Sequence, residues 1–316
     1  MRAETEVSTT AYRIACLSGG GIGPEVMADA TRVLREVGRL HGFEVEELHV
    51  PFGAEAHTSL GHPLPAQTRA AYRGADAILA ASRHTPALEG VCSDLELVAQ
   101  LRRAGFTPEA DVVMLNPIAS GHEEWAIAHA FLLAHYRRGR LFSIDGDRDW
   151  RLLVERLGAN RQEIEIEHLS VDTARLIVTT DPSHLDVVVA GEETAKDLAS
   201  EAGEMTLVAA EAYLASSGPS LFGPTHRTAS RIAGLGVANP SGVLVAVSLL
   251  LAEGLGERVA ADTLDQAIRE ALRKGARTAD MVKAGIAATT REFTETVLAE
   301  LPRARQGNDL STEELR

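Results

Sequence analysis

The chain is poor in the residues on which several kinds of protein depend. It has only two cysteines, Cys16 and Cys92, too few for a disulfide framework or for a metal site built from cysteine ligands. Aromatic residues make up 4% of the sequence, which argues against a stacking platform for single-stranded nucleic acid. No apolar run approaches the roughly 18 residues that a membrane-spanning helix needs.

Positive charge is also scarce. The formal net charge is −14, so no basic surface is available to release counterions from a nucleic acid. The N-terminal residues MRAETEVSTT lack the apolar stretch of a secretory signal, and we therefore expect a cytoplasmic protein that binds neither nucleic acid nor membrane. With 316 residues, of which 45% are hydrophobic, the chain is long enough for two lobes or one large α/β domain.

Strands and helices alternate along most of the chain. Short apolar runs predict buried strands, and apolar residues at helical spacing predict the helices between them. The predicted strands are 14–17, 43–50, 76–81, 111–115, 140–144, 163–169 and 186–189, and the predicted helices are 24–41, 123–136, 148–157, 240–255, 262–274 and 290–301. Repeated βα units of this kind form a mostly parallel sheet with helices on both faces.

A polar, glycine-rich stretch, SLFGPTHRTASRIAGLGVANPSG, occupies residues 220–242 and precedes the most apolar run of the chain, residues 243–251. Pro240 is well placed to open a helix there, because a proline in the first turn loses no intrahelical hydrogen bond. A loop that feeds a buried helix can turn its backbone N–H groups towards a ligand. A plain surface connection is the alternative, since it has the same composition.

This stretch resembles the nicotinamide-nucleotide loop of the isocitrate and isopropylmalate dehydrogenase family, whose pattern is E-P-x-H-G-[ST]-A-P-x-x-A-G-x-x-x-x-N-P. The matching residues are Pro224, His226, Thr228, Ala229, Ala233, Gly234, Asn239 and Pro240, and the departures are Gly223, Arg227 and Ser230. Further segments are similar to family motifs, namely GGGIGPE at 19–25, HPLP at 62–65, VDTA at 171–174 and RTAD at 277–280.

The resemblance implies an α/β, two-lobed isopropylmalate-dehydrogenase-like fold, with parallel or mixed sheets flanked by helices. Residues 1–95 and 207–316 would form a discontinuous nucleotide-binding lobe, and residues 96–206 a middle lobe for the substrate side and dimerisation. The family also implies a homodimer, a small hydroxy-acid substrate, a nicotinamide nucleotide, and a magnesium or manganese ion.

On the nucleotide side, the resemblance assigns to the cofactor His226, Arg227, Thr228, Ala229, Arg231 and Asn239. NAD-using relatives often have aspartate where this chain has Arg231, and a guanidinium suits a 2′-phosphate, so NADP is favoured over NAD. Failure to bind any nucleotide is the other outcome, because Arg227 replaces a glycine that permits close backbone approach.

On the substrate side, the first carboxylate-binding arginine of the family, in L-R-K-x-x-D-L, corresponds to Arg102, for which a solvated helix arginine is the alternative. The second arginine, in N-L-R-P, falls on Asn116. The catalytic lysine position is Gly146, and the chain is shorter than its relatives between Pro117 and Glu123, where the catalytic tyrosine belongs. Both proton-transfer groups of the family reaction are therefore missing from the sequence.

The metal ligands are ambiguous. Asp172 matches the aspartate that the neighbouring subunit would contribute. A gapless alignment puts Lys196 and Ser200 at the other two aspartate positions, which removes the metal, whereas a shift by one residue puts Asp197 and Glu201 there, at i and i+4 on one helical face. A solvated helix face with charges at this spacing explains the same residues, so the sequence favours a site without magnesium or manganese.

No Gly-x-Ser-x-Gly elbow, P-loop or H-E-x-x-H motif is present. The remaining candidates for catalysis are Asp172 and the pair His122 and Glu123, which open a helix beside the shortened segment. Two functions stay open. One is a divergent NAD(P)-dependent oxidoreductase acting on an unidentified hydroxy-acid-like substrate, and the other is a catalytically silent relative that acts as a binding or regulatory partner. Retention of the nucleotide loop favours the enzyme.

Overall fold

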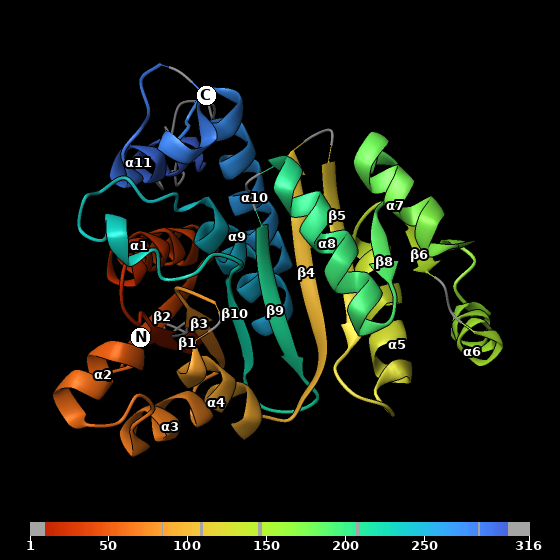
Figure 1. Ribbon diagram of the computed structural model, residues 1–316, viewed down its shortest axis with the longest axis horizontal. Coiled ribbons are helices and arrows are strands. Elements are labelled where there is room, and N and C mark those ends of the chain that lie inside the picture. The colour runs from red at the N-terminus through yellow and green to blue at the C-terminus, as the bar shows by residue number, and fades with distance from the viewer. Residues whose placement is uncertain are drawn as a thin grey trace, which may run out of the picture.

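The computed structural model describes residues 10–83, 85–107, 110–144, 147–206, 209–283 and 285–302. One mixed sheet of ten strands runs through them (Figure 1). In order across the sheet, the strands are β2 (Phe43–His49), β1 (Thr10–Leu17), β3 (Ala77–Ala80), β10 (Ser220–Pro224), β9 (Ala209–Ala215), β4 (Leu97–Thr107), β5 (Ala110–Pro117), β8 (Val187–Val189), β6 (Arg140–Ile144) and β7 (Glu165–Leu169). The outer strands pair in parallel, whereas β10, β9, β4 and β5 pair antiparallel in the middle.

Helices cover both faces of the sheet. They are α1 (Gly23–His41), α2 (Gly53–Leu60), α3 (Ala66–Arg73), α4 (Pro86–Asp94), α5 (Glu123–Tyr136), α6 (Arg148–Gly158), α7 (Val171–Thr180), α8 (Glu192–Thr206), α9 (Ser241–Leu249), α10 (Arg258–Arg273) and α11 (Thr290–Glu300). Short turns of other helix types are η1 (Pro182–His184), η2 (Ser230–Ile232), the π-helical η3 (Leu250–Gly254) and η4 (Ala279–Met281). Among the described residues, no helix is long and apolar enough to cross a membrane.

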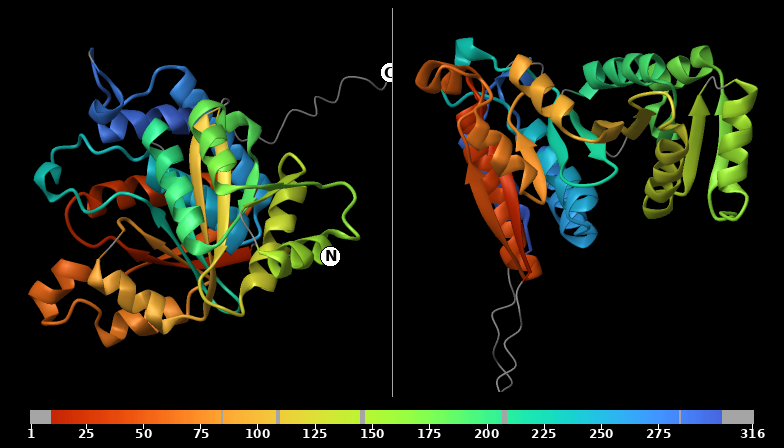
Figure 2. Two further views of the ribbon diagram at one scale, coloured as in Figure 1. Left: turned by 45° about the vertical axis from the view of Figure 1, so that its right-hand side comes forward. Right: turned by 90° about the horizontal axis from the view of Figure 1, so that it is seen from below.

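The two faces of the sheet are covered differently. On one face, α1, α5, α9 and α10 share a single apolar core with strands from the whole width of the sheet. On the opposite face there are two separate cores, one beneath α2, α3 and α4 and the other beneath α7 and α8. Figure 1 shows α8 in front of the sheet and α10 behind it. Figure 2 shows α2, α3 and α4 on one side of the central strands, and α7 and α8 on the other. A gap over β9 and β4 therefore separates the two cores.

Most of the predicted elements are confirmed. The strands predicted at 14–17, 76–81 and 186–189 correspond to β1, β3 and β8, and their apolar residues are buried. Residues 243–251 are buried in α9 and the π-helical turn that follows it. The mixed sheet flanked by helices confirms the predicted fold class. The lobe boundaries, 1–95 with 207–316 and 96–206, stay a prediction.

The sequence interpretation missed three strands in the middle of the sheet, β4, β9 and β10. Residues 220–224 are a buried strand rather than the start of a loop. Arg102 lies within β4 and is 5% exposed, so the alternative of a solvated helix arginine is wrong. Gln, Leu, Arg and Ala all favour helices when isolated. Here β5 and β9 pair with β4 on its two sides, and that tertiary pairing overrides the local preference.

Candidate active-site cleft

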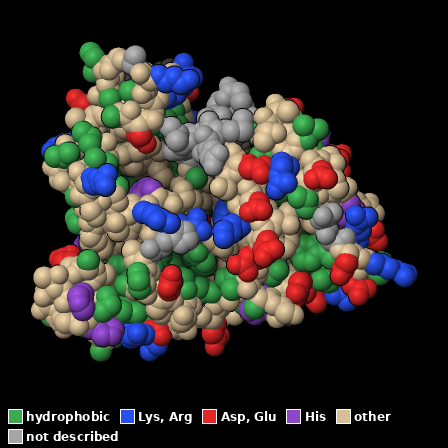
Figure 3. All heavy atoms as spheres, viewed as in Figure 1, with side chains coloured by type: hydrophobic (Ala, Val, Ile, Leu, Met, Phe, Trp, Pro, Cys, Tyr) green, Lys and Arg blue, Asp and Glu red, His purple; other side chains and the backbone are tan. Residues whose placement is uncertain are grey.

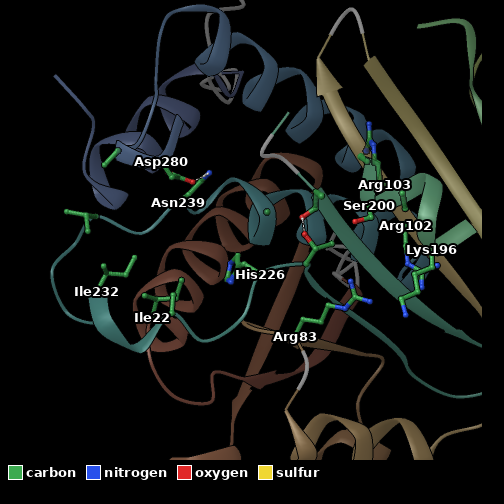
Figure 4. Close-up of a pocket in the computed structure, with 18 of the residues that line it drawn as sticks. Ile22, Arg83, Arg102, Arg103, Lys196, Ser200, His226, Ile232, Asn239 and Asp280 are labelled. Atoms are coloured by element: carbon green, nitrogen blue, oxygen red, sulfur yellow. Dashed lines mark hydrogen bonds between the residues drawn. The ribbon is translucent and has the colours of Figure 1, made fainter. Parts of the chain in front are cut away.

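A cavity of about 970 Å³ opens between the two cores, over the central strands. Its lining comes from the strands β4 and β9, the helix α8, the loop after β3, and the loop between β10 and α9. The space-filling view shows Lys and Arg side chains gathered at this hollow (Figure 3). In the close-up, Arg83, Arg102 and Lys196 lie towards one end of the cavity, and His226, Asn239 and Asp280 lie towards the other (Figure 4).

We call the end of the cavity with Arg83, Arg102 and Lys196 the basic end. Buried polar side chains form its floor. Gln100 and Arg102 are two residues apart on β4, so they point to the same face of the sheet. Asn116 lies opposite Gln100 on β5, and Glu211 lies opposite Arg102 on β9. All four are at most 5% exposed. Three neighbouring strands therefore place a buried polar row where an apolar core would otherwise be expected.

Arg102 is the centre of this row. Its Nη1 donates to Asn116 Oδ1 at 2.7 Å and its Nη2 donates to Gln100 Oε1 at 2.6 Å, while Nε is buried without a partner among the described residues. Burial lowers the pKa of Arg102, and the carboxylate of Glu211 partly offsets this effect. The predicted substrate-binding arginine thus lines the cavity, held by the neutral amides of Gln100 and Asn116 rather than by a carboxylate.

Arg83 and Glu211 are site residues that sequence reasoning did not identify. Arg83 Nε lies 3.0 Å from Glu211 Oε1, and Gln100 Nε2 donates to Glu211 Oε2 at 3.0 Å. Burial raises the pKa of Glu211, and Arg83 and Arg102 act against this increase. The available signal was one carboxylate inside the otherwise apolar strand AAEAYLA. The backbone N–H of Arg83 also donates to the carbonyl of His226 at 2.9 Å, which ties the basic end to the predicted nucleotide loop.

His226 presents an acceptor to the cavity. Its Nδ1 lies 3.0 Å from the carbonyl oxygen of Arg227, and a carbonyl can only accept, so Nδ1 carries the proton. Burial lowers the pKa of His226, which keeps the ring neutral and leaves Nε2 as an acceptor. That Nε2 is buried without a partner in the described part of the chain. Such an atom suits a donor group on a ligand.

The rest of the predicted nucleotide loop forms the rim of the cavity. Ala229 lines it in a left-handed backbone conformation, with φ 41°, and Arg227 and Arg231 are exposed. The carbonyl of Thr228 accepts from Ile22 N at 2.9 Å. A Cβ at Gly21 would lie 1.9 Å from that carbonyl oxygen, so only glycine allows the two loops to dock.

Asn239 and Asp280 close this end. Asn239 Nδ2 donates to Asp280 Oδ2 at 3.0 Å, and Asn239 Oδ1 accepts from the backbone N–H of Ser241 at the start of α9. Asp280 ends the RTAD motif at 277–280, to which the sequence assigned no role in the site. Asp280 nevertheless lines the cavity together with Asn239. Of the six residues predicted for the cofactor, His226, Ala229 and Asn239 line the cavity, whereas Arg227, Thr228 and Arg231 do not.

Within one chain, Asp197 and Glu201 are not both in the cavity. Lys196, Asp197 and Ser200 on α8 line it, whereas Glu201 accepts from Arg175 Nε at 2.7 Å and is absent from the lining. Asp172, which was assigned to the site of the neighbouring subunit, is exposed at the start of α7 and away from the cavity of its own chain, so its role stays a prediction. Among the residues described, no three His, Cys, Asp or Glu side chains are grouped closely enough to hold a metal ion.

The other catalytic candidates lie elsewhere. Neither His122 nor Glu123 lines the cavity, and Glu123 Oε2 accepts from the backbone N–H of Gly121. Gly146, at the position of the family's lysine, is outside the described residues. The structure therefore gives the pair 122–123 no contact with the cleft of its own chain.

The fold is that of known dehydrogenases. A β-decarboxylating dehydrogenase from Thermococcus kodakarensis superposes with a TM-score of 0.77 at 24% identity, covering 92% of this chain and 96% of that one. An isocitrate dehydrogenase from Methylococcus capsulatus superposes with a TM-score of 0.74 at 22% identity, covering 92% of this chain and 99% of that one.

Sequence comparison gives the family. The chain matches the isocitrate/isopropylmalate dehydrogenase family over residues 13–106 and 108–297. It is 30% identical to a 3-isopropylmalate dehydrogenase of Synechococcus sp. (strain CC9605), over 87% of this chain and 94% of the relative. It is 31% identical to the chloroplastic 3-isopropylmalate dehydrogenase 1 of Arabidopsis thaliana, over 87% of this chain and 83% of the relative. The chain belongs to the isocitrate/isopropylmalate dehydrogenase family.

Proposed function

We propose that this protein is a divergent NAD(P)-dependent oxidoreductase that acts on a small hydroxy acid without metal-assisted oxidative decarboxylation. The arrangement of the cleft carries the proposal. Residues of the nucleotide loop line one end, cationic side chains line the other, and the backbone of Arg83 is hydrogen-bonded to His226 between them. A bound nucleotide and a bound acid would therefore share one cavity.

A nicotinamide nucleotide fits the residues of the loop end. His226 Nε2 is a buried acceptor without a partner, and Asn239 adds an amide beside it. Ile22 and Ile232 give this end apolar surface for a ring. When bound, the nucleotide supplies a hydride acceptor. The protein's part is to hold it against the basic end and to exclude water from the space between.

A divalent metal does not fit the residues of the basic end. Hard cations such as Mg²⁺ take oxygen ligands, chiefly carboxylates. Asp197 is the one carboxylate that α8 gives to the lining, and Lys196, its neighbour in sequence, brings a positive charge to the same place. Arg102 and Lys196 would instead hold the substrate carboxylate directly. The proton-transfer residues of the family reaction are replaced or missing, so the substrate should keep its carboxyl groups.

We further propose that NADP is preferred. Arg227 and Arg231 are exposed, and no carboxylate within reach is paired with either in the described residues. A guanidinium can meet a 2′-phosphate with two parallel charge-assisted hydrogen bonds. Calorimetric titration of NADPH and NADH tests both proposals. NADPH should bind more tightly to the wild type, and Arg231→Asp should reverse or abolish the preference. If the ratio is unchanged in this variant, Arg231 is not the selector.

The silent relative remains the second candidate. It is favoured by the short connection of residues 118–122 between β5 and α5, which leaves no room for a segment with the family's tyrosine. The same titration separates the two functions. If neither nucleotide binds at millimolar concentration, the oxidoreductase proposal fails and the silent relative replaces it.

We also propose a homodimer formed by the middle segment. Exposed leucines on α5, α6 and α7 support it, because large apolar side chains left in solvent mark subunit contacts. These are Leu132, Leu152 and Leu176. Sedimentation of the wild type and of Leu176→Glu measures the oligomeric state, and a monomeric wild type would contradict the proposal.

A further inference from the structure

The basic end of the cleft has more positive than negative charge. Arg83, Arg102 and Lys196 contribute three cations, and Glu211, which forms an ion pair with Arg83 and accepts from Gln100, contributes one anion. Even with Glu211 ionised, two positive charges are left over. Asp197 is the other carboxylate in the lining here and is exposed, as Lys196 is, so counting its charge as well leaves an excess of one positive charge. The second arginine of β4, Arg103, does not add to the excess because Asp111 and Asp265 neutralise it.

The surroundings of Arg102 give the strongest indication that an anionic ligand neutralises this excess positive charge. A buried charge is costly unless it is paired and hydrogen-bonded. Arg102 is 5% exposed, the two hydrogen bonds of its guanidinium go to neutral amides, and its Nε is buried without a partner among the described residues. The amides of Gln100 and Asn116 fix the guanidinium, and they leave its charge available. A group held in this way is prepared for an anion.

Lys196 brings a further positive charge to the cavity. It lies one helical turn before Ser200 on α8, and both line the cavity, so the same face of the helix offers an ammonium and a hydroxyl. No ion pair of Lys196 with a carboxylate is formed within the described part of the chain. Figure 4 shows Lys196 and Arg102 at the same end of the cavity, and Arg83 extends towards that end.

We propose that Arg83, Arg102 and Lys196 form a metal-independent site for the oxyanion groups of a small dicarboxylate, with the Lys196 ammonium taking the place of a bridging divalent cation. Each guanidinium can bind one carboxylate in a forked geometry, and the lysine provides a compact point charge between them. Glu211 is a positioning residue, since it contacts Arg83 and Gln100 and not the cavity. The proposal rests on the oxidoreductase function for its biological meaning, but the anion site is testable without nucleotide.

The experiment measures malonate binding by calorimetry and by thermal shift, without nucleotide, in buffer freed of metals over a chelating resin. A resin is preferred because a soluble polycarboxylate chelator would itself compete for the site. Each titration is repeated with added magnesium and with manganese. Inorganic phosphate serves as an anion of a different shape, and acetate serves as an anion with a single carboxylate.

Three variants are compared with the wild type. Lys196→Gln removes the proposed charge from an exposed side chain, and Lys274→Gln is the matched control, because Lys274 is paired with Glu300 on α11, away from the cleft. Lys196→Asp converts the ammonium into a potential metal ligand. Since these side chains are exposed, the variants should fold.

We expect malonate to bind the wild type without metal, to bind more tightly than acetate, and to gain nothing from magnesium or manganese. Lys196→Gln should weaken binding roughly tenfold, as expected for loss of a charge-assisted hydrogen bond, and Lys274→Gln should not. Lys196→Asp should abolish binding in metal-free buffer.

The proposal is overturned if the wild type needs a divalent cation to bind malonate, if nothing binds at millimolar concentration, if phosphate binds and malonate does not, or if Lys196→Gln equals Lys274→Gln. Its failure is distinct from failure of the oxidoreductase function. Metal-free malonate binding without nucleotide binding would leave the anion site standing, and the reverse result would leave the oxidoreductase standing.

Discussion

Replacing Asp111 by asparagine should destabilise the protein from the face of the sheet opposite the cleft. Asp111 Oδ1 accepts from Arg103 Nε at 2.9 Å, and Oδ2 accepts from Arg103 Nη2 at 3.0 Å. Oδ2 also accepts from Arg269 Nη2 at 2.7 Å, and Arg137 Nη2 lies 3.4 Å away. One carboxylate therefore meets guanidinium groups from β4, from α10 and from the segment between α5 and β6.

The size of the loss in unfolding free energy depends on the carboxylate partners that the arginines retain in the variant. Removing one partner of a buried ion pair destabilises by about 3–5 kcal/mol. Arg103 keeps Asp265 at 2.7 Å and Arg137 keeps Asp186 at 2.8 Å, so the effect should fall at the lower end, about 3 kcal/mol. Asparagine preserves the side-chain volume, and the change therefore reports charge rather than packing.

The pH dependence gives an independent check. Arg103 and Arg137, together with Arg269, hold the pKa of Asp111 well below its usual range, despite burial. A depressed folded-state pKa contributes stability that is fully present above the unfolded value of about 3.9 and is lost as the pH falls through the folded value. The difference between wild type and variant should therefore be constant near neutrality and shrink in acid.

Urea unfolding followed by far-UV circular dichroism at pH 7, 5 and 3 measures this difference. Asp149→Asn on α6 is the control, because Asp149 is exposed and should leave the transition near that of the wild type. A loss below about 1 kcal/mol at pH 7, within the range of surface pairs, would refute the reasoning. So would a difference that is unchanged between pH 7 and pH 3.

Three other predictions concern the cleft. Gly21→Ala puts a Cβ 1.9 Å from the Thr228 carbonyl oxygen at a φ of 66° and should weaken nucleotide binding, measured by calorimetry, at least tenfold. Gly20→Ala is the control, because a Cβ at Gly20 meets nothing closer than 3.8 Å, and equal affinities of the two variants would contradict the prediction. Isopropylmalate and isocitrate should give no NAD(P)H above a blank in a spectrophotometric assay, since loss of one positioned acid or base lowers a rate about 10²–10⁴-fold. Robust turnover would show that Gly146 does not stand at the position of the family's catalytic lysine. Burial lowers the pKa of His226, so nucleotide affinity should be flat above the ordinary histidine value of about 6.5 and fall in acid as Nε2 is protonated; an affinity that rises in acid would reject this role.

Several of the elements predicted correctly are buried throughout. Residues 14–17, 77–81 and 243–251 are buried, and short apolar runs of that kind identify buried elements without knowledge of their neighbours. The strands β4 and β9 were missed because Gln100, Arg102 and Glu211 interrupt their apolar pattern. Local rules fail most often at functional sites, where buried polar groups are kept for binding.

Site residues divide in a similar way. The loop residues around His226 could be predicted because they lie close together in the sequence and carry a family motif. Arg83 and Glu211 could not, because their pairing joins the loop after β3 to a strand that begins at Ala209. For α8, the sequence left two alignments open, and the structure places Lys196, Asp197 and Ser200, but not Glu201, in the lining of the cavity.

The position of the polar row on central strands has a consequence for motion. β4 and β9 each pair with a neighbour on both edges, so their amide hydrogens exchange with solvent only when several ladders open together. The Arg102 end of the cavity should therefore be among the slowest-exchanging parts of the chain, while the exposed rim at Arg227 and Arg231 exchanges early. Ligand access to the cavity would then depend on motion of the loop with Arg227 and Arg231, while the strands β4 and β9 beneath it stay fixed.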